Sequence, residues 1–397
     1  MPPIHSNRLA FFISQLGCGG AERVTVNLIR AAADAGIPID LLLARAEGPL
    51  LSEVPSQVRI INFRAARLQR AIPKIALYLR RERPWGIISQ ITHANLVCLI
   101  ARALAGTKTP LVAVEHNHFS AMRAAGGVRP RVERLARWLY PWADHIVAVS
   151  SGAARDVEQC LGLPAHRVRT VYNPIVDARL LARAEEPCPH PWLADGTSRT
   201  TDEQPVLLTV GRLAPQKDHA TLLHALAIVR RTRAARLVIF GEGAERARLE
   251  SLRRQLGLEA AVDLPGLTDN PYAAMRAASL FVLSSRFEGL PTVLVEALAC
   301  GCPAVSTTCP SGPAEILADG RYGTLVPPEN PEALAAGILQ GLDWHWDRDK
   351  LRRRGAEFSM DASLHEYLDI LDYPRAPSVA PAALGLATLR QRQTTAA

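Results

Sequence analysis

Short apolar runs of four to six residues recur along the chain, separated by longer stretches in which apolar positions follow a helical spacing. This alternation predicts parallel β-sheets with helices on both faces, because a strand followed by a helix re-enters its sheet in the parallel direction. The predicted strands begin at residues 9, 39, 58, 86, 111, 145 and 168 in the first half, and at 205, 236, 280 and 303 in the second.

The alternation is interrupted over residues 176–204, which are rich in proline and polar residues. We therefore expect an N-terminal domain over 1–175, an interdomain linker over 176–204 and a C-terminal domain over 205–373. Each domain is long enough for its own core, and two doubly wound domains can present their strand ends to a shared cleft. Residues 374–397, rich in alanine, proline and threonine, are expected to be disordered.

Composition indicates a globular protein, with 48% hydrophobic and 5% aromatic residues. No apolar stretch approaches the ~18 uncharged residues of a membrane span, and the first residues lack a secretory-signal pattern. A cytoplasmic location is the expectation. The cysteines are seven and scattered, which argues against a disulfide framework. Cys300, Cys302 and Cys309 have no histidine or fourth cysteine at zinc-site spacing, so no metal is expected there.

Positive charge is concentrated in the first half: residues 1–187 hold 24 Lys and Arg against 14 Asp and Glu, and the remainder 22 against 24. The densest part is a predicted helix from Arg64 to Arg83, and a second basic run comprises Arg123, Arg129, Arg131, Arg134 and Arg137. Two interpretations stay open: solvated helix faces, or an anionic membrane leaflet or phosphorylated lipid as partner. Nucleic acid is disfavoured, since interleaved aromatics are few and no nucleic-acid motif is present.

Two carboxylates eight residues apart, Glu288 and Glu296, are the most informative chemical feature. The run Leu280–Ser285 reads as a buried strand, and Pro291 suits the first turn of a nearly apolar helix. The free N–H groups at such a helix start favour an anion such as a diphosphate. Glu296 is then expected inside an apolar helix, where a carboxylate needs hydrogen-bond donors such as a ribose diol. An isolated pair of this spacing would more often be surface acids.

From Arg286 to Leu317 the chain reads RFEGLPTVLVEALACGCPAVSTTCPSGPAEIL, which resembles the Glu-x7-Glu signature of the family 4 retaining glycosyltransferases. The resemblance covers most of the chain and is strongest over 206–328. It implies an α/β GT-B fold, in which two doubly wound Rossmann-like domains face a central cleft. The N-terminal domain would be the acceptor side, and the C-terminal domain would bind the nucleotide sugar.

The same resemblance implies roles for single residues. Glu288 would contact the donor sugar, Glu296 the ribose, and the helix start at Gly289, Leu290, Thr292 and Val293 the diphosphate. In GRLAPQK the family carries Arg and Lys at the positions of Arg212 and Lys217, following Gly211. Two cations at the end of a strand suit a departing diphosphate.

Further positions follow from the family's loops. The family's first loop corresponds to Gly19 and Gly20, and its catalytic His or acid to His116, with Glu115 and His118 as weaker candidates. The nucleotide base would lie near Gly241, Gly243 and Leu267. Taken alone, a glycine-rich turn or a histidine at a strand end is a weak signal.

The implied reaction is retaining transfer of a hexose-type sugar, with UDP as the expected nucleotide, to a lipid-linked acceptor or growing surface glycan. Since the second glutamate is assigned to ribose, no nucleophile is evident and front-face attack is expected. No metal or cofactor is expected. Asp347-Arg348-Asp349 mimics a metal motif but lies in a polar run rather than after an apolar strand. Such an acceptor would bring the cytoplasmic protein to the inner face of the plasma membrane.

Two other activities fit the same architecture. A nucleotide-sugar epimerase would need acids or bases that break the donor without an acceptor. A non-catalytic nucleotide-sugar-binding protein would not need both glutamates and both cations.

Overall fold

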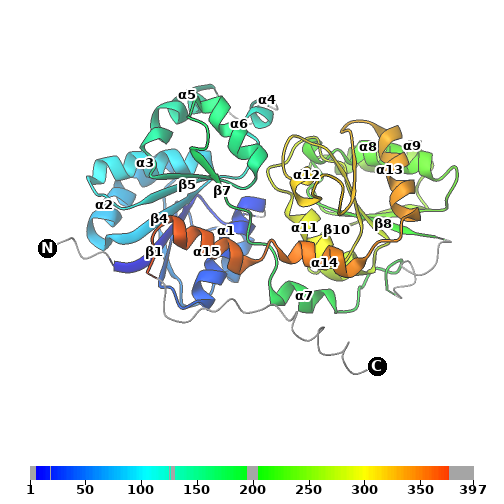
Figure 1. The fold of residues 1–397 in the computed structure, drawn as a ribbon, viewed down its shortest axis with the longest axis horizontal. Coiled ribbons are helices and arrows are strands. Elements are labelled where there is room, and N and C mark those ends of the chain that lie inside the picture. The colour runs from blue at the N-terminus through cyan, green and yellow to red at the C-terminus, as the bar shows by residue number, and fades with distance from the viewer. Residues whose placement is uncertain (1–5, 18, 125, 127–129, 195–203, 375–397) are drawn as a thin grey trace. The chain divides into compact units, whose positions relative to one another are not determined.

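The structure, a computed structural model, describes residues 6–17, 19–124, 126, 130–194 and 204–374. The chain divides into two compact units: unit 1 is Met1–Ile175 with Met360–Ala397, and unit 2 is Val176–Ser359. Each unit is built on one parallel sheet with helices on both faces, as the alternation of apolar runs predicts (Figure 1).

The sheet of unit 1 has seven strands in the order β3-β2-β1-β4-β5-β6-β7. They are β1 (Ser6–Ile13), β2 (Ile39–Leu43), β3 (Arg59–Asn62), β4 (Pro84–Gln90), β5 (Leu111–Glu115), β6 (His145–Ala148) and β7 (Val168–Thr170). The helices are α1 (Gly20–Asp34), α2 (Ile72–Glu82), α3 (Thr92–Ala105), α4 (Phe119–Ala124), α5 (Pro130–Leu139), α6 (Ser151–Leu161) and α15 (Met360–Ile370), with short 3-10 turns η1 (Pro49–Glu53), η2 (Leu68–Ala71) and η3 (Tyr140–Trp142).

Crossover direction decides which face each helix of unit 1 covers. The chain moves from β1 to β2 in one direction and from β4 through β7 in the other, and right-handed crossovers therefore place the helices on opposite faces. Helices α2, α3, α5 and α6 share one apolar core with the sheet, whereas α1 packs against α15 (Figure 1).

The sheet of unit 2 has six strands in the order β10-β9-β8-β11-β12-β13. They are β8 (Val206–Val210), β9 (Arg236–Phe240), β10 (Val262–Gly266), β11 (Leu280–Leu283), β12 (Ala304–Thr307) and β13 (Thr324–Val326). The helices are α7 (Ala178–Ala184), α8 (His219–Val229), α9 (Arg246–Gln255), α10 (Pro271–Ala277), α11 (Thr292–Ala299), α12 (Pro313–Ile316), α13 (Pro331–Asp343) and α14 (Arg348–Ala356), with the 3-10 turn η5 (Pro215–Lys217). Helix α8 packs against α9 and α13, and α11 packs against α10, α12 and α14.

All eleven predicted strands are present, and two further strands, β10 and β13, form the edges of the second sheet. Strand β10 contains Pro265, which an edge strand tolerates because one side of its backbone has no ladder partner. Strand β13 is three residues long. Both were too short or too irregular for the apolar pattern to predict them.

The domain boundaries differ from the sequence expectation in two places. Part of the predicted linker, α7, packs against α10 within unit 2, and Asp177 caps its N-terminus. Helix α15, predicted as the end of the second domain, belongs to unit 1: the indole of Trp85 donates to the carbonyl of Leu371 at 2.9 Å, and the Tyr373 hydroxyl donates to the Asn7 carbonyl at 2.5 Å. Residues 195–203 of the predicted linker lie outside the described residues, as do residues 375–397 of the tail, for which disorder was predicted over 374–397.

In each sheet the strand order reverses once, between β1 and β4 in unit 1 and between β8 and β11 in unit 2. The loops that leave such neighbouring strands at their carboxyl ends diverge to opposite faces, and ligands of doubly wound sheets bind in the crevice between them. The candidate residues of each unit follow these strands or their neighbours. Within the described part of the chain, no helix is both long enough and apolar enough to span a bilayer.

Candidate functional site

The two loops at the strand reversal of unit 2 are joined by an ion pair. Lys217 comes from the loop after β8 and Glu288 from the loop after β11, and Nζ of the lysine lies 2.6 Å from Oε1 of the glutamate. Both side chains are largely buried, with 15% and 9% of their surface exposed. The pair forms because β8 and β11 are hydrogen-bonded neighbours although the two residues are far apart in the chain.

Three uncharged side chains hold Glu288 in place. The Ser285 hydroxyl donates to Oε1 at 2.6 Å, and the Ser311 hydroxyl donates to the Glu288 carbonyl at 2.7 Å. The amide of Gln216 donates to the Phe287 carbonyl at 2.9 Å. These contacts fix the position of the Glu288 side chain. A ligand that binds there would need little rearrangement of this carboxylate.

Sequence reasoning did not single out Gln216, Ser285 or Ser311. Their signal is present in retrospect: Gln216 directly precedes Lys217, Ser285 comes three residues before Glu288, and Ser311 begins the SGP segment. Small hydroxyl residues are common in turns, so only the tertiary contacts identify these as supports.

Two arginines at this strand reversal, Arg212 after β8 and Arg286 after β11, differ in their environment. The guanidinium of Arg212 is exposed, and no acidic partner lies within 4 Å of it in the described part of the chain. Arg286, in contrast, lies 3.3 Å from a carboxylate oxygen of Asp218 and 3.3 Å from one of Glu329. Among the described residues, Arg212 therefore presents a charge without an ion pair in the loop after β8.

Helix α11 exposes one narrow stripe. Thr292, Val293 and Glu296 are half-buried, while Leu294, Val295, Ala297, Leu298 and Ala299 are buried. Glu296, expected as a carboxylate inside an apolar helix, lies on this half-buried stripe, four residues after Thr292. Pro291 precedes the helix as its N-cap and offers no side-chain cap. Thr292 and Glu296 thus lie on one side of the helix, and the free N–H groups of the first turn are at the N-terminal end of the same helix.

Two glycines allow the loops after β8 and β9 to touch backbone to backbone. A Cβ at Gly241 would lie 1.9 Å from the Gly211 carbonyl oxygen, and one at Gly243 would lie 2.4 Å from that of Leu213. The amide of Gly211 donates to Phe240 at 2.9 Å, and that of Gly241 donates to Gly266 at 2.8 Å. These contacts give Gly241 and Gly243 a structural reason independent of any ligand.

The loop after β10 ends this row of backbone contacts. Leu267 follows Gly266 there and is 77% exposed. A large apolar side chain this exposed at the carboxyl edge of a parallel sheet offers a flat surface to a ligand.

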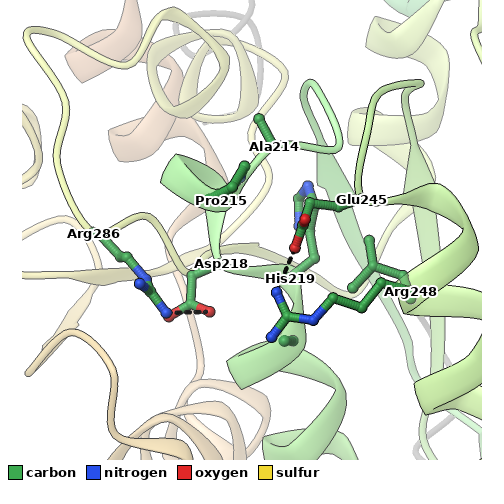
Figure 2. A pocket seen from close by; sticks show the side chains of 9 residues that line it. Ala214, Pro215, Asp218, His219, Glu245, Arg248 and Arg286 are labelled. Carbon is green, nitrogen blue, oxygen red and sulfur yellow. Dashed lines mark hydrogen bonds and ion pairs between the residues drawn. The ribbon is translucent and has the colours of Figure 1, made fainter. Parts of the chain in front are cut away.

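A small pocket of about 40 Å³ lies beside the Lys217 loop, lined by residues from α8, α9, their preceding loops and the loop after β11 (Figure 2). Its labelled members include Asp218, His219, Glu245, Arg248 and Arg286. Burial lowers the pKa of the His219 imidazole to about 4, and neither ring nitrogen has a hydrogen-bond partner in the described part of the chain. The two acids are occupied by arginines, Asp218 by Arg286 and Glu245 by Arg248.

In unit 1, His116 follows β5 and is buried. Its Nε2 lies 2.5 Å from Oε1 of Gln90, the last residue of β4. Burial lowers the pKa of the imidazole to about 4, so the ring is neutral near pH 7. A neutral ring that donates from Nε2 to Gln90 keeps Nδ1 as an acceptor.

Glu115, directly before His116, is fully buried in a polar cluster. Its carboxylate accepts from Thr92 at 2.9 Å, from Asn95 at 3.2 Å and from the Tyr140 hydroxyl. Burial raises the pKa of this carboxyl to about 7, against the lowering effect of those donors. Between Gln90 and Thr92, Ile91 adopts φ 77°, a left-handed conformation that is costly for a β-branched residue.

The remaining candidates of unit 1 are placed as follows. Gly19 is the N-cap of α1 and Gly20 its first residue; a Cβ at Gly20 would meet nothing within 4 Å. Cys18 lies outside the described residues. Nδ1 of His118 lies 3.3 Å from Asp156 and 3.2 Å from the Ser120 hydroxyl, which gives this histidine a local structural role.

The two acids of the sequence Asp347-Arg348-Asp349 in unit 2 interact with residues of helix α14. Asp347 caps α14 by accepting from the Lys350 amide at 2.9 Å, and Asp349 pairs with Arg352 at 2.6 Å. Across the described residues, no group of three or more His, Cys, Asp or Glu side chains has an arrangement that could hold a metal ion.

Two family descriptions together cover most of the chain. Residues 195–358 match Glycosyl transferases group 1, and residues 18–179 match Glycosyltransferase Family 4. A curated relative from Campylobacter jejuni, N-acetylgalactosamine-N,N'-diacetylbacillosaminyl-diphospho-undecaprenol 4-alpha-N-acetylgalactosaminyltransferase, is 32% identical over 87% of this chain and 92% of its own. The lipopolysaccharide core biosynthesis glycosyltransferase LpsE of Rhizobium meliloti is 29% identical over 89% of this chain and 96% of its own.

Solved structures show the same fold. The structure of Anabaena HepE in complex with UDP and glucose matches with a TM-score of 0.74 and 20% identity, covering 93% of this chain and 100% of that one. The apo form of the lipopolysaccharide outer core galactosyltransferase WaaB matches with a TM-score of 0.71 and 21% identity, covering 92% and 99%.

Proposed function

The chain belongs to the family 4 retaining glycosyltransferases, within glycosyl transferases group 1, and has their GT-B fold. We propose that it transfers a hexose-type sugar from a UDP-sugar donor to a lipid-linked or growing surface-glycan acceptor. The donor proposal draws on the relatives solved with UDP, and the acceptor proposal on the diphospho-undecaprenol and lipopolysaccharide-core substrates in the relatives' names.

The observation that carries the proposal is the contact between Lys217 and Glu288. It brings a cation and a carboxylate from two separate motifs to 2.6 Å from each other, and Arg212, in the same loop as Lys217, is exposed. A sugar diphosphate needs both kinds of group: hydrogen-bond acceptors for its hydroxyls and cations for its phosphates. On donor binding, Lys217 would exchange Glu288 for a phosphate oxygen, and Glu288 would then accept from a sugar hydroxyl.

The chemical step follows from these roles. As the glycosidic bond breaks, negative charge grows on the departing diphosphate, and Arg212, Lys217 and the first N–H groups of α11 would stabilise it. The acceptor hydroxyl would attack from the face that the diphosphate leaves and pass its proton to the leaving phosphate oxygen, so that the configuration is retained. Because protein cations balance the charge, the reaction would need no divalent metal.

Other residues would position the donor. Glu296, on the accessible stripe of α11 with Thr292 and Val293, would accept from the ribose hydroxyls, and Gly289 and Leu290 would let the backbone approach the phosphates. Leu267, with the backbone at Gly211, Gly241 and Gly243, would border the base. In unit 1, the neutral His116 would accept a hydrogen bond from a sugar hydroxyl at Nδ1, and Gly19 and Gly20 would allow close approach of the sugar.

The partner surface we propose is the inner leaflet of the plasma membrane. A diphospholipid acceptor is confined to a bilayer, and the two basic segments, Arg64–Arg83 and Arg123–Arg137, would be attracted to anionic lipid. Arg129 of the second run lies outside the described residues. On this proposal the enzyme would act in the cytoplasm, attached peripherally to the membrane.

The test is release of free nucleotide. Purified protein is incubated with UDP-sugars that raise its melting temperature, with and without a lipid-diphosphate acceptor. Acceptor-dependent release of UDP with retained anomeric configuration supports transfer. Interconversion of the donor without acceptor would instead indicate an epimerase, and donor binding without any turnover would indicate a binding protein.

A further inference from the structure

Exposed apolar side chains of unit 1 gather on neighbouring helices of one sheet face. Among the described residues, nine large hydrophobic side chains are well exposed, and five of them lie on α2, α3, α5 and η3. These five are Leu77, Leu104, Leu135, Trp138 and Trp142, and we refer to them with the surrounding surface as the α2–α3–α5 face. The two tryptophans stand out, since Trp138 is 74% and Trp142 55% exposed.

Helix α5 presents a mixed cationic and aromatic stripe outward. Arg131, Arg134, Leu135 and Trp138 are all exposed and follow one helical face at i, i+3, i+4 and i+7. The opposite side of the helix, with Glu133, Ala136 and Leu139, is buried. A solvated helix face would carry mixed charges there; this one carries two arginines, a leucine and a tryptophan.

Packing contacts and side-chain-to-backbone hydrogen bonds link α2, α3, α5 and the turn η3. Helix α3 packs against both α2 and α5 (Figure 1). The guanidinium of Arg102 on α3 donates to the carbonyl of Trp142, and Arg80 on α2 donates to the carbonyl of Leu104 at 2.7 Å. The end of α3 therefore lies beside Trp142 on one side and α2 on the other.

The charge of this region is strongly positive and its acids are occupied. Residues 64–144 contain fourteen Lys and Arg against four Asp and Glu, an excess larger than the net +8 of the whole chain. Glu133 pairs with Arg123 and Arg137, Glu82 with Arg59 and Asp144 with Arg102. Arg131 and Arg134 have no acidic partner within 4 Å in the described part of the chain.

These observations decide between possible occupants. A second copy of the chain would bring an equal excess of cations and be repelled. Nucleic acid would match the charge but gives no reason for exposed leucines and tryptophans on helices. An anionic bilayer matches both features, because tryptophan rings prefer the headgroup level and arginines pair with lipid phosphates.

We propose that the α2–α3–α5 face docks on an anionic phospholipid bilayer, with Trp138 and Trp142 inserted at the interface and Arg131 and Arg134 on lipid phosphates. The inference rests on the proposed function only for the choice of membrane, which is the one that holds the proposed acceptor. Docking by insertion differs from charge attraction alone, because burial of apolar surface is not screened by salt.

The experiment is flotation of the full chain with vesicles of phosphatidylglycerol and phosphatidylcholine, or of phosphatidylcholine alone, at low and high salt. We expect binding to the anionic vesicles, a part of which survives high salt, and a blue shift of tryptophan fluorescence. The double variant Trp138→Ala/Trp142→Ala should lose at least about tenfold in vesicle partitioning. The double variant Arg131→Glu/Arg134→Glu should lose mainly the low-salt part.

The matched control is Trp344→Ala, which removes a tryptophan of unit 2 that is 62% exposed. It should bind vesicles as the wild type does. The rise in melting temperature with UDP should be unchanged in all variants, because it reports the proposed donor site and the folded state rather than docking.

Three results would overturn docking: equal binding to neutral and anionic vesicles, wild-type binding by the double tryptophan variant, or absence of vesicle binding by the wild type. A dimer that the tryptophan changes dissociate, without vesicle binding, would assign the face to a second copy. With the UDP response intact, each of these would leave the proposed function standing; loss of the UDP response in the wild type would count against the function instead.

Discussion

Lys217 and Glu288 are 71 residues apart in the chain, yet Nζ of the lysine lies 2.6 Å from Oε1 of the glutamate. The contact makes two residues proposed for separate tasks depend on each other. Each charge offsets the desolvation cost of burying the other. Changes at this pair should therefore affect both stability and turnover, whereas changes at the exposed Arg212 should affect turnover alone.

The first prediction compares these two cations. Lys217→Ala leaves Glu288 buried without its cation and should lower the free energy of unfolding by about 1–3 kcal/mol. Arg212→Ala, at an exposed side chain, should change it by less than about 0.5 kcal/mol. Both should raise the barrier to transfer by about 2–4 kcal/mol if each cation stabilises the leaving diphosphate. Denaturant unfolding and steady-state kinetics measure the two effects; a loss of activity below about threefold in either variant would contradict its role.

A second prediction concerns Glu288 and its support. Glu288→Gln should lower kcat, since the carboxylate is proposed to act on the sugar that changes charge in the transition state. Ser285→Ala removes one hydroxyl donor to that carboxylate and should lower kcat less, without changing the KM for donor. Wild-type kinetics in the glutamine variant would show that Glu288 has no part in the reaction.

Glu296 should behave differently. Because ribose contacts change little between ground and transition state, Glu296→Gln should weaken donor binding and leave kcat nearly unchanged. Its half-buried position on α11 means that the fold should tolerate the change. Calorimetric titration with UDP measures the affinity; a variant with reduced kcat and normal affinity would exclude a ribose role.

Metal independence is a fourth prediction. Activity should survive dialysis against EDTA, since Arg212 and Lys217 are proposed to balance the diphosphate charge. Loss of activity that manganese restores would require a metal site. Variants of Asp347 and Asp349 would then be the first to examine, although these residues cap and pair within α14 here.

The fifth prediction uses the buried Glu115, whose pKa burial raises from 4.5 to about 7. Between these values the folded chain holds a proton that the unfolded chain has released, so this contribution to stability is lost as pH rises toward 7. From about pH 5 to pH 8, the wild type should lose about 3 kcal/mol more unfolding free energy than Glu115→Gln, whose amide does not titrate.

Unfolding curves of wild type and Glu115→Gln across this range provide the measurement. The buried histidines His116 and His219 have lowered pKa values and push stability in the opposite direction. They are present in both proteins, so they cancel in the difference. Parallel pH dependences in the two proteins would mean that Glu115 is ionised throughout.

Much of the fold could be predicted from local pattern. Apolar runs such as the one in β1 bury every side chain from Leu9 to Ile13, so hydrophobicity alone marks them. The apolar pattern does not predict strand β10, because Asp263 and Pro265 interrupt its apolar residues. An edge strand tolerates such a proline, and β10 is at the edge of its sheet. Helix α15 was assigned to the wrong unit because an amphipathic pattern does not say which core the helix joins.

The sequence by itself determined the residue types and their turns: Arg212 and Lys217 after one strand, Glu288 and Glu296 around the start of one helix, and a basic first half. Only the tertiary structure decided which of them meet. Strand order brings Lys217 to Glu288, and the polar turns add Ser285, Gln216 and Ser311 around it. Packing also left Glu296 on the half-buried side of α11, and it brought the backbone of Trp142 to the guanidinium of Arg102. The physical reason is that strand and helix formation depend on neighbours in the chain, whereas contact, burial and charge pairing depend on neighbours in space.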